Sequence, residues 1–366
     1  MAGSVQICPP APLQTYVEAV FNAIGADAEI AGVVAAHLIR ANLSGHDSHG
    51  VIRVPQYVGE ADRGALRPAA RPTLVRETEV AAVVDANRGF GHFSTVFALD
   101  WALSRARRGG LAAVAVRHST HIGRLGEYTE RAAAGGLIAV VTVGAAGPGL
   151  GSVVPFGGQA RFLSTNPWSI GVPGRDRAMV FDGATSMVAE GKVRVARAKG
   201  ALLPPGCIVD RNGAPSRNPE DFYEGGSLLP LGGEEAGHKG YGLALASAMF
   251  GALAMIDDPN PTLPGARLQT EGSERGRAGG VFLAAIDPGA FGDAERYRAM
   301  VGDTLGAAKR VPPAPGRDEV LLPGEPETIT RRQRAGGIAV PETTWQELVA
   351  LGERFHVPLP EHRPAP

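Results

Sequence analysis

The chain has 366 residues, 44% of them hydrophobic and 20% charged, a balance typical of a globular protein with one large domain or two to three interleaved ones. Its 36 basic and 37 acidic residues give a net charge of −1, without a basic stripe or an acidic tail. This argues against a nucleic-acid partner and does not favour a membrane surface. Cys8 and Cys207 are the only cysteines, so a disulfide framework is excluded and a structural zinc site is not expected.

Helical and strand patterns alternate along the chain, which favours an α/β or α+β fold. Apolar residues recur at helical spacing from Asp27 to Leu43, with Asp27 as the N-cap, and a short helix is expected from about Gly50 to Tyr57. Further strands are expected at 79–86, 111–117, 137–143, 179–182 and 282–286, and further helices at 93–107, 123–134, 240–255 and 342–355, the helix at 240–255 being buried. Residues 200–235 are rich in Gly, Pro and Asn, which predicts loops and hairpins.

No apolar run is long enough to span a bilayer, and the first residues do not have the pattern of a signal peptide. The expected location is therefore the cytoplasm. The dinucleotide fingerprint G-x-G-x-x-G is also missing, because Gly89-Phe90-Gly91 is followed by Ser94 and lacks a suitably placed acidic partner. A nicotinamide cofactor, if one binds, must be held by an architecture other than the Rossmann fold.

The segment 45–57 contains a possible site for an organic acid. His49 and Arg53 are four residues apart and would share one face of a helix, with Ser48 beside His49 at the expected helix start. Arg53 and the backbone N–H groups of a helix start can bind a carboxylate, and a histidine can exchange a proton near neutral pH. The plainer alternative is a capping turn in which Asp47 or Ser48 caps the helix and His49 only packs.

The segment 117–128 follows a strand and leads into a helix. Gly123 and Gly126 would allow the backbone to approach a phosphate closely. His118 and His121 are three residues apart, which could suggest a metal, although no third ligand stands at useful spacing. The alternative is an ordinary glycine-rich turn with surface histidines.

Three further segments are ambiguous by themselves. Short polar side chains gather where strands should end, and they are either ligand contacts or turn formers: Ser164, Thr165, Asn166, Asp182, Thr185 and Ser186. Lys192 stands among small apolar residues and could reach a substrate oxygen from an inward face. His238 is either a ligand contact or a helix cap, and the turn at 321–334 is uninformative alone.

Taken together and in this order, the segments resemble the malate/L-lactate/ureidoglycolate dehydrogenase family. The resemblance covers residues 10–355. It is carried by SHG-x-x-R (48–53), HIGRLGEY (121–128), STNP (164–167), D-x-ATS-x-x-A-x-GK (182–192), PPGCIVDRNGAPSRNP (204–219), HKGYGLALA (238–246) and LLPGE (321–325). The subgroup that it resembles most is hydroxycarboxylate dehydrogenase B.

The resemblance implies an α/β (α+β) fold like that of sulfolactate dehydrogenase, a non-Rossmann NAD(P)-binding fold with a largely antiparallel sheet and a helical domain. Residues 1–75 and 312–366 would form the helical domain, which carries the SHG segment and serves dimerisation. Residues 76–311 would bind NAD(P) and include a loop-rich insertion at about 200–236. The usual assembly of the family is a homodimer.

The resemblance also implies roles for individual residues. Ser48 and His49 match a catalytic pair, Arg53 the carboxylate binder, and His121 a histidine beside the substrate that also serves as proton acceptor. Lys192 is expected to polarise the substrate and Thr165 to contact it. The implied cofactor contacts are Ile122, Gly123, Arg124, Leu125, Gly126, Asp182, Gly183, Ala184, Thr185, His238, Leu322, Pro323, Gly324 and Glu325, and no metal is expected.

Two positions depart from the family pattern. The imine-reducing members have an acidic residue where this chain has Lys192, and a lysine favours an oxygen substrate over a cyclic imine. Gly279 replaces a cofactor-contacting asparagine of the subgroup, so one hydrogen bond to the cofactor is lost or comes from the backbone.

The sequence thus predicts an NAD(P)-dependent 2-hydroxyacid dehydrogenase, with NAD favoured over NADP, acting on a small malate-, lactate- or phenyllactate-like molecule. One alternative on the same scaffold is reduction of a cyclic imine such as Δ1-piperideine-2-carboxylate, or oxidation of ureidoglycolate. An alternative of another class is a catalytically idle binding protein, which only Gly279 supports.

Overall fold

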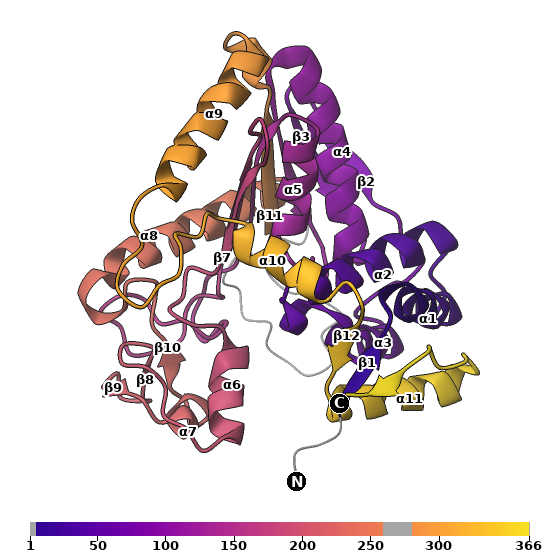
Figure 1. Ribbon diagram of the computed structural model, residues 1–366. Coiled ribbons are helices and arrows are strands. Elements are labelled where there is room, and N and C mark those ends of the chain that lie inside the picture. The colour runs from indigo at the N-terminus through magenta and orange to yellow at the C-terminus, as the bar shows by residue number, and fades with distance from the viewer. Residues whose placement is uncertain (1–4, 259–279, 366) are drawn as a thin grey trace.

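The computed structural model describes residues 5–258 and 280–365, so Gly279 lies outside the described residues. A seven-stranded sheet forms its centre, in the order β2-β3-β4-β11-β5-β6-β7 (Figure 1). Its strands are β2 (Thr73–Glu77), β3 (Ala81–Asp85), β4 (Leu111–Arg117), β11 (Gly280–Ile286), β5 (Ile138–Gly144), β6 (Trp168–Val172) and β7 (Met179–Gly183). β3 and β4 run parallel and the other neighbours in this sheet are antiparallel, which confirms the predicted largely antiparallel sheet.

The alternation of side chains along the strands explains how helices cover both faces. On β11, Val281, Leu283 and Ala285 are buried against helix α4 (Gly91–Gly109), while helix α5 (Gly126–Ala134) covers the neighbouring strands β5 and β6. Phe282 points to the other face, where its ring lies 4.9 Å from that of Phe250 on α8 (Gly233–Ala252). A Cβ at Gly280 would lie 1.9 Å from the carbonyl oxygen of Gly251, so the pair of glycines lets α8 lie directly on the sheet.

The two ends of the described chain build a separate helical cluster. It contains α1 (Pro10–Ala23), α2 (Ala28–Leu43), α3 (Val54–Asp62) and α11 (Glu342–Phe355), beside a small sheet β12-β1-β13 (Ile338–Val340, Gln6–Cys8 and Arg363–Pro364). The side chain of Asp27 accepts a hydrogen bond from the backbone N–H of Ile30, which confirms the predicted N-cap of α2. The domain boundaries near residues 75 and 312 stay a prediction.

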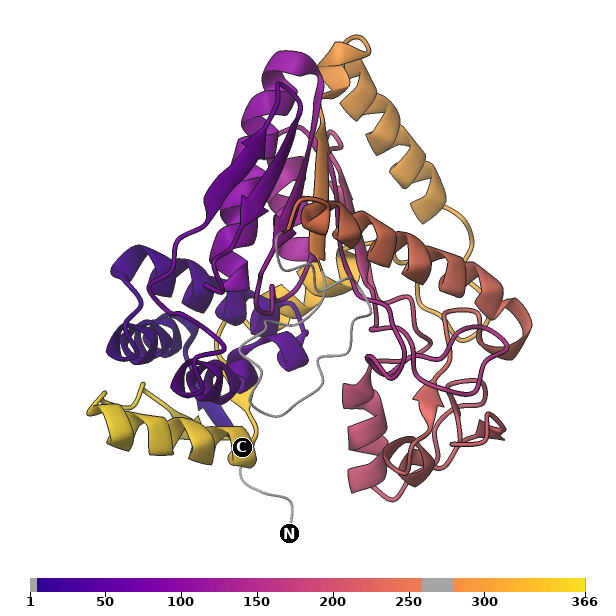
Figure 2. The same ribbon diagram turned by 180° about the vertical axis from the view of Figure 1, so that it is seen from behind.

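A second cluster lies at the opposite lower corner of the molecule (Figure 2). It holds α6 (Glu190–Ala198), α7 (Pro219–Tyr223) and the short strands β8 (Ile208–Val209), β9 (Pro215–Ser216) and β10 (Ser227–Leu228) around its own apolar centre. The hairpin expected within 200–235 is confirmed. The short helix α7, which Asn218 caps, was not predicted.

Helix α8 differs from the prediction in its start and its burial. It begins at Gly233 rather than Gly240, and it is only half-buried, with 56% of Met249 exposed. Its apolar composition suggested a buried helix, but only one of its faces contacts the sheet. Helices α9 (Ala294–Lys309) and α10 (Glu325–Gln333), which are mostly polar, complete the chain together with the short turns η3 (Leu253–Met255) and η4 (Pro288–Ala290). Across 5–258 and 280–365, no helix has both the length and the apolar character needed to cross a membrane.

Candidate active site

The loop between α2 and α3 carries the predicted catalytic pair. Its two 3₁₀ turns are η1 (Asp47–His49) and η2 (Val51–Arg53). The side-chain oxygen of Asn42 accepts from the Val51 N–H at 2.8 Å, while its amide nitrogen donates to the Asp47 carboxylate. A Cβ at position 50 would lie 2.1 Å from the Asn42 side chain, so Gly50 is needed for this tight loop.

Ser48, His49 and Arg53 do not lie on one helix, and this part of the prediction is wrong. Gly50 has φ −93° and ψ −150°, an extended conformation that separates the two turns. The three side chains are nevertheless connected. The Ser48 hydroxyl lies 2.9 Å from Nδ1 of His49, and Nε of Arg53 donates to the Ser48 carbonyl oxygen at 2.6 Å. A second guanidinium nitrogen of Arg53 donates to the side-chain oxygen of Gln56, which fixes the orientation of the group.

His121 joins this loop from the end of β4, more than 60 residues further along the chain. Its ring stacks on that of His49 with 5.5 Å between the centroids. Its Nδ1 lies 2.6 Å from the hydroxyl of Tyr57 on α3. The fold therefore brings together His49, Ser48, Arg53 and His121, four residues that were predicted from two separate motifs.

Sequence reasoning missed three side chains behind these four: His37 on α2, Tyr57 on α3 and His92 at the start of α4. All three are buried. The rings of His37 and His92 meet edge to face at 4.7 Å, and the Tyr57 hydroxyl lies 3.5 Å from Nε2 of His92. The available signal was a histidine within an apolar helical stretch, which more often indicates core packing than a site.

Burial keeps these imidazoles neutral. It lowers the pKa of His49 to about 4, and the positive charges of Arg53, His46 and Arg124 act in the same direction. Burial likewise lowers the pKa of His92 to about 3, together with the charges of His49 and Arg53. Neutral imidazoles can accept a proton or donate a hydrogen bond, as acid–base chemistry near neutral pH requires.

His118 stands three residues from His121, a spacing that could suggest a metal, but its imidazole has other partners. Its Nδ1 lies 3.0 Å from a carboxylate oxygen of Asp85, and its Nε2 lies 2.8 Å from one of Asp258. Within the described part of the chain, no cluster of three or more His, Cys, Asp or Glu side chains has an arrangement that could hold a metal ion. His118 is thus a link between β3, β4 and the end of η3.

The predicted cofactor turn, Ile122 to Gly126, lies next to the histidines and leads into α5. Gly123 has φ +73° and packs against His37, whose Nε2 accepts from the Arg124 N–H at 3.0 Å. The Asp182 carboxylate, at the end of β7, accepts from the Gly126 N–H at 2.7 Å and caps α5. This places the two predicted cofactor segments side by side.

Arg124 is the buried cation of this turn, with 2% of its side chain exposed. It donates to Glu130 at 2.9 Å, and its Nε lies 3.6 Å from Asp182. Its Nε and Nη1 have no hydrogen-bond partner among the described residues. Burial raises the pKa of Asp182, although the charge of Arg124 opposes this shift.

The STNP segment is hydrogen-bonded to the residues that follow β7. The backbone N–H and the hydroxyl of Thr185 both donate to the Thr165 carbonyl oxygen. Asn166, fully buried at φ +36°, bonds through its amide group to the backbone of Ala145 and of Ala244 on α8. Asn166 therefore has a structural role. Gly183, Ala184 and Thr185 follow Asp182, the residue that caps α5, directly in the chain.

The other predicted parts of the site are Lys192, His238 and the turn from Leu322 to Glu325. Lys192 is exposed on α6 rather than on an inward face, and its contact with a substrate stays a prediction. His238 is exposed inside α8, where its ring meets that of Phe156 at 5.6 Å, so it does not cap the helix. The turn from Leu322 to Glu325 lies on β7, where the Val180 N–H donates to the Pro323 carbonyl oxygen.

The side chain of Glu325 is already engaged inside the protein. It accepts from the Leu322 N–H and binds Lys309 and Arg177. A contact between this turn and a cofactor would therefore come from Leu322, Pro323 or Gly324 rather than from the carboxylate. Gly324, at φ +92°, is the N-cap of α10.

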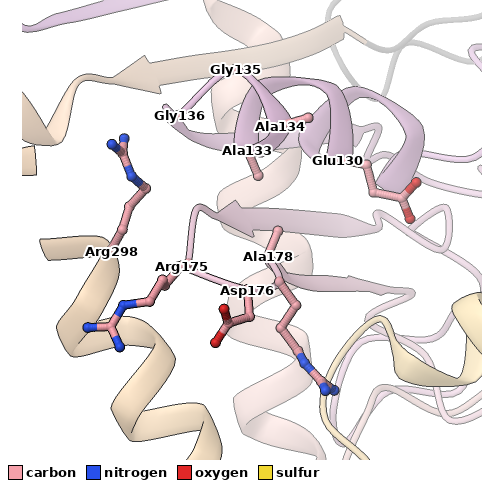
Figure 3. Close-up of a pocket in the computed structure, with 11 residues that line it drawn as sticks. Glu130, Ala133, Ala134, Gly135, Gly136, Arg175, Asp176, Ala178 and Arg298 are labelled. Atoms are coloured by element: carbon pink, nitrogen blue, oxygen red, sulfur yellow. The ribbon is translucent and has the colours of Figure 1, made fainter. Parts of the chain in front are cut away.

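A pocket of about 510 Å³ lies at the end of α5 that is away from Gly126 (Figure 3). It is lined by the end of α5, the β6–β7 turn and Arg298 of α9. Its guanidinium groups have acidic partners, since Arg175 faces Asp303, Arg177 binds Glu325 and Arg298 binds Glu295. None of the predicted catalytic residues lines it, so it is not the candidate active site.

The family model for malate/L-lactate dehydrogenase matches residues 8–349. The chain belongs to this family. It is 35% identical to hydroxycarboxylate dehydrogenase B of Escherichia coli (strain K12), over 94% of this chain and 93% of that protein.

Solved structures agree with this assignment. Sulfolactate dehydrogenase from Methanocaldococcus jannaschii matches with a TM-score of 0.86 and 30% identity, over 96% of this chain and 98% of that one. Δ1-Piperideine-2-carboxylate reductase from Pseudomonas syringae matches with a TM-score of 0.77 and 29% identity, over 94% and 99%. The predicted fold is confirmed, and the chain is an oxidoreductase of the hydroxyacid dehydrogenase type.

Proposed function

We propose that this enzyme transfers a hydride reversibly between a nicotinamide cofactor and C2 of a small 2-oxoacid or 2-hydroxyacid. The observation that carries the proposal is the meeting of Ser48–His49, Arg53 and His121 in one place. A cation for a carboxylate and two imidazoles for an oxygen that gains or loses a proton fit the two functional groups of such a substrate.

Each residue has a distinct role in this proposal. Arg53, oriented by Ser48 and Gln56, binds the substrate carboxylate and so fixes C2 near the histidines. His49, bonded to the Ser48 hydroxyl, exchanges the proton with the substrate oxygen, and His121 is the alternative for this step. A positioned general acid or base of this kind accelerates a reaction by about two to four powers of ten. Thr165 and Lys192 would contact the substrate only if the elements that carry them approach it.

The turn from Ile122 to Gly126 suits a nicotinamide dinucleotide. The bound cofactor would supply or accept the hydride at its nicotinamide ring. The buried Nε and Nη1 of Arg124 are two donors without a hydrogen-bond partner among the described residues, although Nε pairs with Asp182 at 3.6 Å, and they match phosphate or ribose oxygens. Gly123 and the backbone from Asp182 to Thr185 line the same region, with Leu322 to Gly324 on the far side of β7. We propose NAD rather than NADP.

The second candidate is reduction of a cyclic imine. The fold match to a Δ1-piperideine-2-carboxylate reductase favours this possibility, and ureidoglycolate oxidation is a further use of the same scaffold. Lys192, where imine-reducing members have an acidic residue, favours the open-chain acid. A catalytically idle binding protein is the alternative of another class.

A substrate panel separates these possibilities. The purified enzyme is mixed with NADH or NADPH and with pyruvate, oxaloacetate, 2-oxoglutarate, phenylpyruvate or Δ1-piperideine-2-carboxylate, and the absorbance of the reduced cofactor is followed. Oxidation of NADH by an open-chain acid supports the proposal. Turnover of the imine alone would contradict it. The absence of both turnover and cofactor binding would favour the idle protein.

We further propose that the enzyme works in the cytoplasm as a homodimer. The free, buried thiols of Cys8 and Cys207 suit a reducing compartment. Apolar side chains on α8 and just beyond it recur at helical spacing and are exposed, as at an unfilled interface: Leu243, Met249, Phe250, Leu253 and Ile256.

A further inference from the structure

Tyr57 lies between His92 and His121, and the proposed reaction gives it no role. It lies one helical turn after Arg53 on α3, with 1% of its surface exposed. Its hydroxyl oxygen is 2.6 Å from Nδ1 of His121 and 3.5 Å from Nε2 of His92. A tyrosine hydroxyl has one proton to donate, so these contacts decide which nitrogen of His121 carries its proton.

His92 decides in which direction the hydrogen bonds run from His92 through Tyr57 to His121. Burial keeps its imidazole neutral, with a pKa lowered to about 3, so it carries a single ring proton. Its Nδ1 is buried without a hydrogen-bond partner among the described residues. An unpaired buried N–H is costly, so the proton belongs on Nε2, which points to Tyr57. Tyr57 then accepts from His92 and donates its own proton to Nδ1 of His121.

We propose that Tyr57 and His92 are positioning residues that hold neutral His121 with its proton on Nε2. An imidazole has two nitrogens, and Tyr57 engages Nδ1, so His121 meets the substrate through Nε2–H. His121 is then a hydrogen-bond donor that polarises the substrate oxygen. The proposal rests on the proposed function.

This arrangement gives the two stacked histidines, His49 and His121, different roles in the reaction. In reduction, C2 of the 2-oxoacid gains the hydride from the nicotinamide, and its oxygen gains the proton on Nε2 of neutral His49. Nδ1 of His49 takes the Ser48 hydroxyl proton in turn, and solvent returns a proton to Ser48, while His121 keeps its own proton throughout. Oxidation of the 2-hydroxyacid is the reverse, with His49 as the base. The Ser48 hydroxyl at Nδ1 of His49 suits this exchange, because a hydroxyl can both donate and accept. Among the described residues, the titratable and charged groups beside Tyr57, His92 and His121 include His37, His49 and Arg53.

A double-mutant cycle tests whether Tyr57 acts through His121. With the 2-oxoacid that the panel identifies, Tyr57→Phe should lower kcat roughly tenfold while KM changes less than about twofold. In the His121→Ala background the same substitution should have no further effect on kcat. An equal loss of kcat in both backgrounds would show that Tyr57 acts independently and would overturn the proposal.

Tyr16→Phe is the matched control, because Tyr16 is also buried and its hydroxyl donates to the Leu348 carbonyl oxygen far from the histidines. Tyr16→Phe should lose about as much thermal stability as Tyr57→Phe does, and it should keep the wild-type kcat. A kcat for Tyr57→Phe equal to that of Tyr16→Phe contradicts the proposal.

Nitrogen-15 NMR reads the tautomer directly, with or without turnover. In wild-type protein carrying ¹⁵N-histidine, the signals of His121, assigned by their loss in His121→Gln, should show a protonated Nε2 and an unprotonated Nδ1. A protonated Nδ1 would overturn the proposal even in a fully active enzyme. If the panel gives no turnover, the proposed function fails, while the NMR result still decides the tautomer.

Discussion

Protonation of the imidazoles of His37, His49 and His92 in the folded protein costs free energy. Burial is the main cause in each, and the three share one small volume next to Arg124 and Arg53. The pKa of each lies below the ordinary value of 6.5, so in the folded protein they stay neutral at a pH where the unfolded chain is already protonated. The stability that they confer is complete above about pH 6.5 and is lost as the pH falls toward 4 and 3.

We therefore expect the thermal unfolding midpoint to fall steeply between pH 6.5 and pH 4.5. His92→Gln, which places a non-titrating amide in the same space, should make this dependence shallower. His356→Asn is the control, because His356 is exposed and its replacement should leave the slope unchanged. Thermal denaturation across this pH range measures the slopes. Equal slopes for wild type and His92→Gln would show that His92 is not the neutral buried group described here.

The residues that could be predicted are those in short, chemically distinctive motifs. Ser48, His49 and Arg53 lie within six residues of one another, and His121 stands in a glycine-rich turn. Tyr57 and His92 could not be predicted, because their role depends on contacts between α3, α4 and the end of β4, which are distant in the sequence. The exposure of Lys192 could not be decided from the sequence for a similar reason, since α6 packs through its buried residue Val193.

At the scale of secondary-structure elements, α10 connects the predicted cofactor turn with the catalytic loop. The helix starts directly after the Leu322–Gly324 turn. Glu327 meets Nε2 of His46 at 3.1 Å, and Arg334 binds both carboxylate oxygens of Asp47 and the Asn42 carbonyl oxygen. A displacement of α10 would therefore move the loop that carries Ser48 and His49.

Arg334→Ala should lower kcat/KM about tenfold, because the catalytic loop loses its fixed position. Thermal stability should change little, since the ion pair is partly exposed. Arg354→Ala is a close control, because Arg354 makes a similar two-pronged pair with Asp62 between distant segments. It should leave kcat/KM unchanged. Comparable losses in both variants would argue against the specific role of α10.

The elements that could be predicted from the sequence are mainly the buried ones. The strands at 111–117, 137–143 and 282–286 are continuous apolar runs in the centre of the sheet and were found within one or two residues. The edge strand β2 is exposed throughout, and β6 interrupts its pattern with Gly171, so neither was expected. The 3₁₀ turns around Gly50 could not be told from a helix, because the side-chain bonds from Asn42 that stabilise them are not part of a helical sequence pattern.

At the scale of the whole molecule, the resemblance implied a largely antiparallel sheet, but neither it nor the pattern of the chain predicted the strand order. β11 lies between β4 and β5, although more than 130 residues separate it from both. No local feature of residues 280–286 specifies that insertion. The same holds for the pairing of β1 with β12, which joins the two ends of the described chain.

The apolar stripe on α8 leads to a prediction about assembly. Met249 and Ile256 are 56% and 73% exposed, and replacing both by glutamate should place unpaired charges in a dimer interface. We expect the apparent mass from light scattering to fall to that of a monomer. Phe291→Glu, at an isolated exposed position, should keep the wild-type mass. A double variant that retains the wild-type mass would exclude this face as the interface.

The central claim is that a hydride passes from the nicotinamide to C2 of a 2-oxoacid at the site formed by His49, Arg53 and His121. The most direct measurement uses reduced cofactor carrying deuterium at C4 of the ring, in separate preparations for its two faces, and analyses the product by mass spectrometry. With one of the two preparations, the account predicts a 2-hydroxyacid with one deuterium on C2. A 2-hydroxyacid without deuterium from either preparation, while the cofactor is consumed, would contradict it.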